Sequence, residues 1–413
     1  MTRHQAPVYQ WRQEIDRHLG GCLSGPQRTV LAVWCLGLVL ARSCALTAVA
    51  GFVAVWEGRE FDAVRQQLRE FCYEAEAKAG RRRRAVEVEQ CFAPLLAWVL
   101  EHSESRQLAL ALDATTLGER FVVLACSVVY RGCAIPVAWT VVRAGEKRAW
   151  RQEWLRMLRL VRPGLPATIR TVIVLADRGL YARWLFGRIV RLGWHPCLRV
   201  NGGGTFRPAG YRQYRRLSSF VPQPGTRWSG TGVAFQGPQR RLGCTLLAAW
   251  EEGCTDPWLI LTDLPPEAAD AGWYGLRAWI ELGFKLTKRA GWQWQRTQMT
   301  DPDRAARLWL VVAVATLWLV RVGGEADAAI PDATLLDLTD VLATDHALVQ
   351  QAHRRQRQAT RLRLIGVFRQ GWIRILVALL RHDPLPIGAF CPEPWPALPR
   401  PIAHPDNELL HAC

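Results

Sequence analysis

The sequence predicts an α/β protein in which helices flank a mixed sheet, with helical regions at both ends of the chain. Three observations lead to this fold class. Apolar residues recur at helical spacing up to about residue 105, short apolar runs alternate with amphipathic segments over residues 106–264, and a basic helical pattern appears after residue 352. With 413 residues, half of them hydrophobic, the chain has enough material for a large core and two or three units.

The balance of charge is strongly basic. Lys and Arg number 53 against 36 Asp and Glu, which leaves a formal net charge of +17. A basic protein of this size usually meets a polyanion, such as DNA, RNA or an anionic membrane. We therefore expect a nucleic-acid partner, against the simpler alternative that the charge only maintains solubility.

The first 105 residues are expected to be helical. Residues 60–80 and 87–100 carry apolar positions at helical spacing, and between them lies a run of four arginines, Arg81, Arg82, Arg83 and Arg84. Such a run is either a solvated loop or a patch that contacts phosphate groups, and the sequence alone leaves both open.

The next segment predicts strands and helices in a fixed order. Three strands come first, at residues 108–113, 121–130 and 134–142, and the short join Arg131-Gly132-Cys133 predicts a hairpin between the last two. The order continues with a helix at 150–162, a strand at 171–177, a helix at 181–192 and a strand at 196–201. An antiparallel trio followed by strand–helix–strand units predicts a mixed sheet with helices on its faces.

A β-rich insertion is expected after the glycines at 202–204. Its strand candidates are residues 228–235 and 242–250, and it is expected to end near residue 257. Residues 258–264 are again as hydrophobic as the core strands. A helix at 274–288, a very basic helix at 353–382 and a Pro-rich tail after residue 383 complete the expected elements.

Two apolar runs, residues 29–41 and 308–320, resemble membrane spans but contain 13 residues each. A span needs about 20 residues, so we expect buried core helices and no membrane. The twelve cysteines include no CxxC pair or zinc-type spacing, and the first residues are polar. These features predict reduced thiols in a cytoplasmic protein.

The helix at 274–288 carries its polar residues along one line. At about 100° per residue, Tyr274, Arg277, Glu281, Lys285 and Lys288 fall within one narrow arc. The simple explanation is ion pairing between residues four apart, with Glu281 between Arg277 and Lys285. That explanation does not account for Tyr274 and Lys288, so we expect a functional strip.

Two aspartates give this strip a partner site. Asp113 is expected to end the first strand and Asp177 the fourth, and sites gather at the carboxyl ends of strands in α/β sheets. With Glu281 they form three carboxylates, a donor set that suits Mg²⁺ or Mn²⁺, and two such ions can run in-line displacement at phosphorus. Other acids compete for this role, namely Asp263, Glu119, Glu146 and Glu153, and Asp263 is the strongest competitor because it also follows a strand.

At these residues the sequence resembles the DDE transposases. The spacing Y-x2-R-x3-E-x6-K is similar to the signature of the insertion-sequence-four type of bacterial transposase, and "LDATTL" (112–117) and "ADRGLY" (176–181) are similar to its other two motifs. The resemblance covers about residues 106–322 and includes a β-rich insertion before the glutamate.

The resemblance implies an RNase H-like, mixed five-stranded sheet and cut-and-paste DNA transposition through a hairpin intermediate. It implies that Asp113, Asp177 and Glu281 are catalytic and hold two Mg²⁺ or Mn²⁺ ions, and that Tyr274, Arg277 and Lys288 grip DNA, with Lys285 assisting. Double-stranded DNA, as terminal inverted repeats and target, is the implied partner, bound by a homodimer at the nucleoid.

The implied organisation has three regions. Residues 1–105, with Arg81 to Arg84, are expected to bind the inverted repeats, residues 106–322 to form the catalytic domain with its insertion at about 202–257, and residues 323–413 to form a basic C-terminal region. Two alternatives stay open: another RNase H-like nuclease that cuts branched or damaged DNA, and a non-catalytic DNA-binding derivative. Trp279 lies near the motif but off the strip, so it receives no role.

Overall fold

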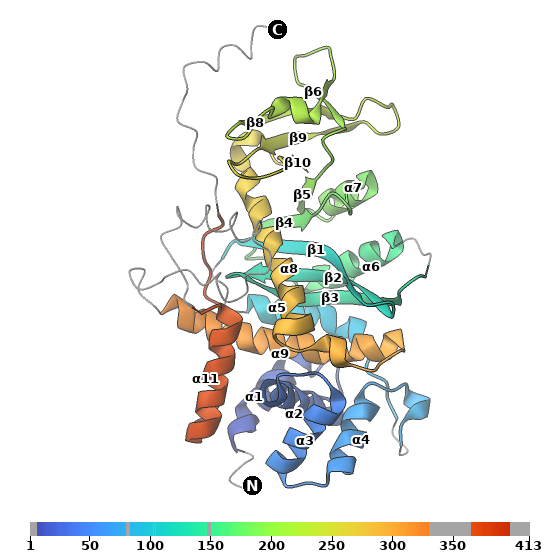
Figure 1. Cartoon of the computed structure of the whole chain (residues 1–413), viewed down its shortest axis with the longest axis vertical. Helices are drawn as coiled ribbons and strands as arrows, with labels where there is room; N and C mark the ends of the chain where they lie inside the picture. Colours follow the sequence, from blue (N-terminus) through green and yellow to red (C-terminus); the bar gives the residue numbers. More distant parts are fainter. Residues whose placement is uncertain are drawn as a thin grey trace. The chain divides into compact units, whose positions relative to one another are not determined.

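The computed structural model describes residues 6–79, 83–101, 103, 105–146, 150–329 and 365–396. The chain divides into two compact units (Figure 1). The first holds the described residues up to Ile173 together with those of 277–329 and 365–393, and the second holds residues 174–276 with the short stretch 394–396. Because the units are defined by contacts and not by function, the predicted three-region division stays a prediction.

The N-terminal part of the first unit is helical, as predicted. Its helices are α1 (Ala6–Leu19), α2 (Gly25–Ala41), α3 (Leu46–Glu57), α4 (Phe61–Phe71) and α5 (Phe92–Leu100). Trp11 of α1 stacks on Trp318 at 4.3 Å between ring centroids and on Trp98 of α5 at 5.6 Å. These helices therefore share one core with the helix that carries Trp318, instead of forming a separate body.

Three antiparallel strands form the sheet of the first unit: β1 (Gln107–Leu117), β2 (Phe121–Tyr130) and β3 (Cys133–Arg143). Tyr130 pairs with Cys133 across a two-residue loop in which Arg131 and Gly132 both have positive φ, so the predicted hairpin is confirmed. Asp113 does not end its strand, because β1 continues to Leu117, and the predicted strand end is wrong. The motif continues as strand since Thr115 and Leu117 are buried on the sheet.

The following elements appear in the predicted order: α6 (Arg151–Val161), β4 (Thr171–Ala176), α7 (Arg183–Arg191) and β5 (His195–Arg199). β4 begins in the first unit and ends in the second. α6 buries Trp154, Met157, Leu158 and Val161 on one face, which is the amphipathic pattern of the sequence.

The second unit contains the β-rich part of the chain. Its later strands are β6 (Thr205–Pro208), β7 (Arg215–Arg216), β8 (Arg227–Ala234), β9 (Leu242–Ala249) and β10 (Trp258–Thr262). In the sheet order, β10 lies between β5 and β9, and β8, β6 and β7 follow outward. The described residues form ten strands, so the predicted count of five is wrong. The insertion strands pair onto the core strands through β9 and β10, and therefore extend the sheet.

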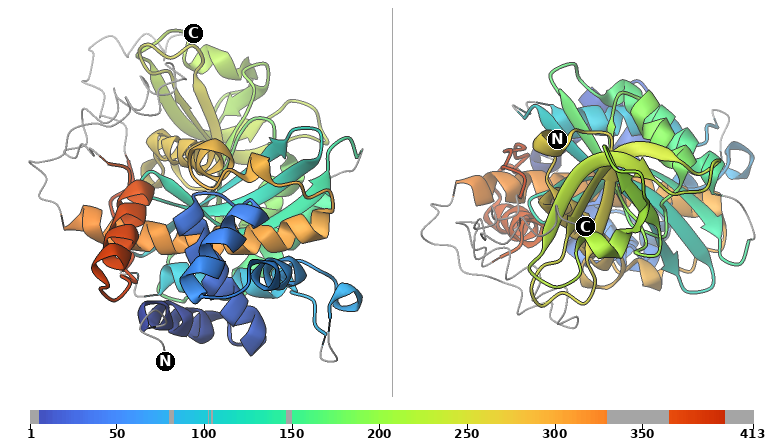
Figure 2. Two further views of the ribbon diagram at one scale, coloured as in Figure 1. Left: turned by 60° about the horizontal axis from the view of Figure 1, so that its bottom comes forward. Right: turned by 90° about the horizontal axis from the view of Figure 1, so that it is seen from above.

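Helix α9 (Pro302–Ala328) is the central helix of the first unit, and α11 (Val367–Arg381) crosses it in Figures 1 and 2. The crossing is close at two glycines. A Cβ at Gly323 would lie 1.8 Å from the Val367 carbonyl oxygen, and one at Gly371 would lie 1.9 Å from that of Leu319. Larger residues at these positions would separate the helices.

α9 is long and apolar enough to cross a membrane, yet 94% of its most apolar window is buried within the protein. Helices α2 and α3 pass the same test only as a pair bent by 104°. Buried core helices share these properties, so both 13-residue runs lie in helices that contribute to the core, as expected.

Two other predicted elements differ from the structure. Residues 274–288 do not form one α-helix: a 3₁₀ segment (Ala271–Arg277) leads into α8 (Ala278–Lys285), and a π-helical segment (Leu286–Ala290) follows. Of the basic helix at 353–382, the part up to residue 364 lies outside the described residues and α11 forms the remainder. After the helix, residues 384–396 contain neither helix nor strand, and the later tail is not described.

Candidate active site

Helix α8 positions Glu281 against the strands of the first unit. The helix packs against β1, β2 and β3, and it passes in front of them in Figure 1. Gly283 permits this approach, because a Cβ there would lie 2.9 Å from that of Ala134 on β3. The change from 3₁₀ to α to π geometry means that a uniform rotation of 100° per residue does not describe this segment.

Arg277 joins Asp113 of β1 to Glu281 of α8. Its Nη2 lies 2.8 Å from Asp113 Oδ2 and its Nη1 lies 2.5 Å from Glu281 Oε1. The arginine side chain is 12% exposed, against 19% for Asp113 and 32% for Glu281. Two acids separated by 168 residues in sequence therefore converge on one guanidinium, which shields them from mutual repulsion.

The pair Arg277–Glu281 is also the i,i+4 contact that the simple explanation of the strip proposed. The bond from Arg277 to Asp113 goes beyond that explanation, because it connects the helix to a strand distant in sequence. The structure thus contains both the ion pair along the helix and a cluster of Asp113, Arg277 and Glu281 that joins the helix to β1.

Asp177 lies in the second unit, directly after β4, as predicted. Tyr274 donates its hydroxyl to Asp177 Oδ1 at 3.0 Å, and Arg199 Nη1 lies 4.0 Å from the same oxygen. Tyr274 is itself buried and packs edge-on against Trp258. Since Asp113 and Glu281 belong to the first unit, the convergence of all three acids stays a prediction.

The two lysines of the strip lie further along the first unit. Lys285 is the last residue of α8, and Lys288 lies in the π-helical segment that follows. Both are half-buried, and burial lowers the pKa of Lys288, with a smaller effect from the neighbouring Arg289. Partial desolvation favours an anionic partner for Lys288, but its role in DNA binding stays a prediction.

Trp279 is half-buried at the start of α8, which does not assign it a role. In the arginine run, Arg83 and Arg84 are exposed outside any helix or strand, while Arg81 and Arg82 lie outside the described residues. Of the competing acids, Asp263 pairs with His195 at 3.1 Å, and Glu153 is buried within α6.

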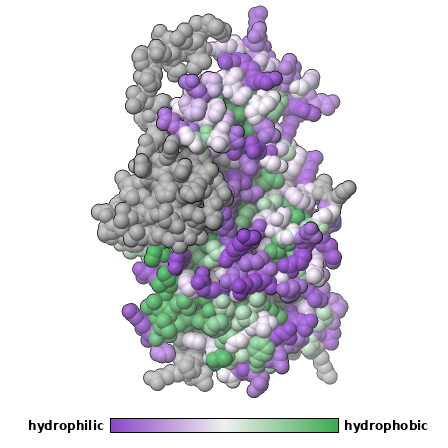
Figure 3. Space-filling view, in the orientation of Figure 1, coloured by the Kyte–Doolittle hydropathy of each residue, from purple (hydrophilic) through white to green (hydrophobic). Residues whose placement is uncertain are grey.

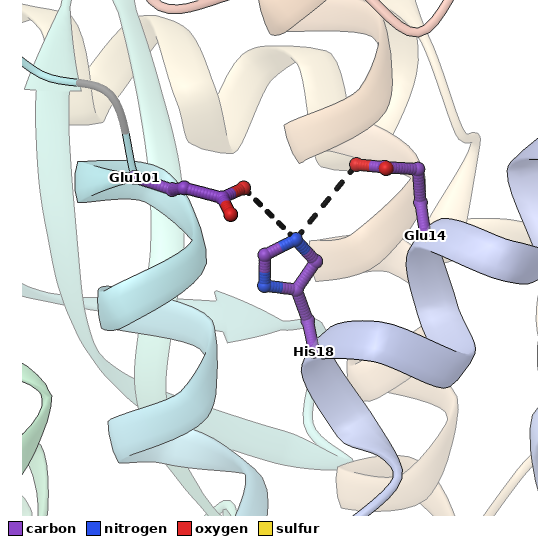
Figure 4. Close-up of side chains that lie close together, drawn as sticks. All are labelled: Glu14, His18 and Glu101. Atoms are coloured by element: carbon purple, nitrogen blue, oxygen red, sulfur yellow. Dashed lines mark ion pairs between the residues drawn. The ribbon is translucent and has the colours of Figure 1, made fainter.

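Sequence reasoning missed a second cluster, formed by Glu14, His18 and Glu101 (Figure 4). One ligand atom from each lies within 4.8 Å of the others, a spacing compatible with a metal ion. His18 Nε2 lies 3.0 Å from Glu101 and 3.8 Å from Glu14. The i,i+4 spacing of Glu14 and His18 on a helix was a visible signal, but the position of Glu101 depends on tertiary packing.

The acids at Arg277 fit a divalent cation by their chemistry. Asp113 and Glu281 supply only carboxylate oxygens, the donors that Mg²⁺ and Mn²⁺ prefer, and they already hold a cationic group in common. An α/β fold that presents carboxylates from a strand and a helix is compatible with the class of metal-dependent phosphoryl-transfer enzymes.

Comparison with known proteins identifies the family. A family model described as "Transposase DDE domain" matches residues 108–318, which is more than half of the chain and includes Asp113, Asp177 and Glu281. The chain belongs to the DDE transposases. A search of curated proteins found no match to this sequence.

Membership has several consequences. A DDE domain implies an RNase H-like fold, metal-dependent phosphoryl transfer on DNA, and DNA as the partner of the protein. The mixed α/β architecture with its sheet and flanking helices agrees with that fold. The Glu14–His18–Glu101 cluster lies outside the matched region.

Proposed function

We propose that this protein is a transposase of the insertion-sequence-four type that moves its element by cut-and-paste transposition. The observation that supports this most is the pairing of Asp113 and Glu281 on Arg277, inside the region matched by the DDE domain. The Tyr-Arg-Glu-Lys spacing and the two aspartate motifs of the sequence support the insertion-sequence-four type within the DDE transposases.

Asp113, Asp177 and Glu281 are the proposed ligands for two Mg²⁺ or Mn²⁺ ions. When bound, such ions supply Lewis acidity at phosphorus and a lowered pKa for an attacking water. The protein itself orients the acids before the ions arrive: Arg277 holds two of them, and the Tyr274 hydroxyl holds the third. The oxygens bonded to Arg277 must exchange its guanidinium for an ion, so Arg277 positions these acids and also competes with the metal.

Tyr274, Arg277, Lys285 and Lys288 are proposed to contact phosphates near the cleaved end. Arginine and lysine form charge-assisted bonds with phosphate, and a tyrosine hydroxyl adds a donor. Water first cuts one strand at the end of the element, the freed 3′-OH attacks the opposite strand to close a hairpin, and the reopened end attacks target DNA.

Other parts of the chain have supporting roles in this proposal. The helical N-terminal region, with Arg81, Arg82, Arg83 and Arg84, would bind the terminal inverted repeats. Two ends must be held together, so we propose a homodimer on DNA, acting at the bacterial nucleoid in the cytoplasm.

The test is cleavage of a DNA duplex that carries the element's own inverted-repeat end. Asp113→Asn, Asp177→Asn and Glu281→Gln should each abolish metal-dependent cleavage and leave binding of the end intact. Asp263→Asn is the matched control, because Asp263 also follows a strand but pairs with His195. Full cleavage by the Glu281 variant would overturn the site, and preference for branched junctions over ends would favour a structure-specific nuclease.

A further inference from the structure

The second unit carries a concentration of positive charge, most of which lies outside the proposed site. Between Asp177 and Glu251 the sequence contains twelve arginines and no aspartate, glutamate or lysine. The net charge of the whole chain is +17, so this stretch of 73 residues accounts for most of the excess. A solvated face usually mixes the two signs of charge, and this stretch does not.

Five of these arginines are exposed near the outer strands β6, β7 and β8: Arg212, Arg215, Arg216, Arg240 and Arg241. Hydrophilic side chains cover much of this part of the molecule in Figure 3, around the position of β6 and β8 in Figure 1. Some arginines elsewhere in the stretch have carboxylate partners, as Arg227 has in Glu251 at 3.0 Å.

Strand pairing and two side-chain hydrogen bonds place Arg216 and Arg241 near the same turn. Arg216 pairs with Thr205 in the β6–β7 ladder, and the Thr205 hydroxyl accepts a hydrogen bond from Gln236 N at 3.0 Å. Arg241 Nε donates to the Gln236 carbonyl oxygen at 3.3 Å. Arg241 is therefore the last residue of a short turn, residues 236–241, that follows β8, and Arg216 pairs with the strand residue that bonds to the start of this turn.

The same turn is fixed from two other directions. The Arg240 and Arg241 amides both donate to the Gly237 carbonyl oxygen, at 2.8 and 3.1 Å. Arg183 at the start of α7 donates to the Gln239 carbonyl oxygen. None of the described carboxylates forms an ion pair with Arg216, Arg240 or Arg241. We call these three residues the arginine face.

We propose that the arginine face binds the phosphate backbone of duplex DNA without regard to sequence. This inference rests on the proposed function only in taking DNA as the substrate, and it adds a contact surface separate from the Tyr274–Lys288 strip. The three arginines lie on a turn and a strand edge and not on a helix, so they can reach phosphates but do not present a helix to a groove. The contact would therefore strengthen binding and add no base readout.

The experiment measures the affinity for a random 40-base-pair duplex as a function of salt, in EDTA so that no cleavage occurs. The test variant is Arg216→Gln/Arg240→Gln/Arg241→Gln. The control variant Arg159→Gln/Arg162→Gln/Arg170→Gln removes the same charge from exposed arginines of the first unit. A third variant, with lysine at the three test positions, keeps the charge, and circular dichroism checks the fold of all three.

Each phosphate contact contributes about 0.9 to the slope of log K against log salt. In the glutamine variant of the arginine face, the magnitude of this slope should therefore fall by about 2 to 3. The variant should bind the duplex at least about tenfold more weakly near 0.1 M salt. The lysine variant should keep most of the slope, and the control should lose less than about 1.

Equal losses in the test and control variants would overturn the proposal, since net charge and not this face would then govern binding. A loss confined to duplex RNA, or to vesicles with anionic lipid, would overturn it in favour of those partners. Normal DNA binding by the test variant with intact end cleavage would reject the arginine face and leave the proposed function standing. If the salt slope changes as predicted but the protein cleaves no inverted-repeat ends, the arginine face stands and the proposed function is rejected.

Discussion

Two clusters in the first unit pair acids with cations, and only one of them lies in the DDE domain. Glu14, His18 and Glu101 have the spacing of metal ligands, with side chains 18%, 11% and 18% exposed. Asp113 and Glu281 have similar exposures, 19% and 32%. Burial therefore does not distinguish the two clusters.

The clusters differ in how their charges are compensated. Each glutamate of the first cluster has an arginine: Arg321 lies 3.0 Å from Glu14, and Arg17 lies 2.5 Å from Glu101. With His18 these residues tie α1 to α5 and α9. Asp113 and Glu281 instead bond to the same arginine. The acids of the DDE domain thus share one counter-charge, whereas each glutamate of the helical cluster has its own.

The largest effect should appear in metal binding. In Asp113→Asn/Glu281→Gln, the affinity for Mn²⁺ should fall by more than about 100-fold, because even partners outside the coordination shell typically cost 10 to 100-fold. In Glu14→Gln/Glu101→Gln it should be unchanged. Electron paramagnetic resonance of free Mn²⁺ measures both, and the opposite pattern would assign the metal to the helical cluster.

The next effect is on stability. Glu14→Gln leaves the Arg321 side chain, which is only 7% exposed, without its charged partner, and should destabilise the protein by about 2 kcal/mol. Thermal denaturation measures this change. Glu57→Gln is the control: its pair with Arg59 is more exposed, at 23% and 40%, and should contribute less than about 1 kcal/mol. Loss of end cleavage by a folded Glu14 variant would contradict a purely structural role.

Arg277 and a metal ion should compete for the same carboxylates. Replacing Arg277 by Gln removes the internal cation, so Mn²⁺ should bind about five- to tenfold more tightly in the absence of DNA, a change on the order of 1 kcal/mol. Titration calorimetry with Mn²⁺ measures the difference. The exposed Arg296→Gln serves as the control. Weaker Mn²⁺ binding in the Arg277 variant would mean that the arginine orders the acids more than it competes.

The smallest effect concerns pH. Burial lowers the pKa of His18 below its usual 6.5, against the opposing attraction of Glu101 and Glu14; Arg17 and Arg321 lower it further. The unfolded chain then binds the proton more readily than the folded one. The contribution of neutral His18 to stability is therefore complete above pH 6.5 and is lost as the pH falls from 6.5 toward the lowered pKa.

His18→Gln should remove this part of the pH dependence and leave the remainder. Denaturation midpoints between pH 5 and 8 compare the two proteins. A variant whose profile keeps the same slope below pH 6.5 would show that other groups are responsible.

Several features could be read from particular residues in the sequence. Residues 121–130 match β2 because a continuous apolar run followed by Arg131-Gly132 leaves few alternatives to a hairpin. Asp177 follows β4 as expected. The sheet of five strands was wrong because the insertion strands pair onto β10 through β9, a partner choice that periodicity does not contain.

The strip at 274–288 shows how far the sequence predicts the structure of a single segment. Its residue types predicted that Glu281 joins the two aspartates and that Tyr274 and Arg277 contact DNA. The contacts of Tyr274 with Asp177 and of Arg277 with Asp113 were not part of that prediction. Its geometry was predicted from one helical pitch, whereas packing of Gly283 on Ala134 and the flanking 3₁₀ and π segments alter the direction of each side chain. Local propensity does not encode such contacts.

By itself, the sequence determined the order of the elements, the basic character and the acidic motifs that lead to the DDE family, because these depend on composition and on spacing along the chain. Only the tertiary structure decided that Arg277 bridges Asp113 and Glu281, that Glu101 meets His18, and that the strand residue paired with Arg216 bonds to the turn that ends at Arg241. The contacts of Arg277 with Asp113 and of His18 with Glu101 join residues far apart in sequence. Their formation depends on how strands register and helices pack, which local patterns do not specify.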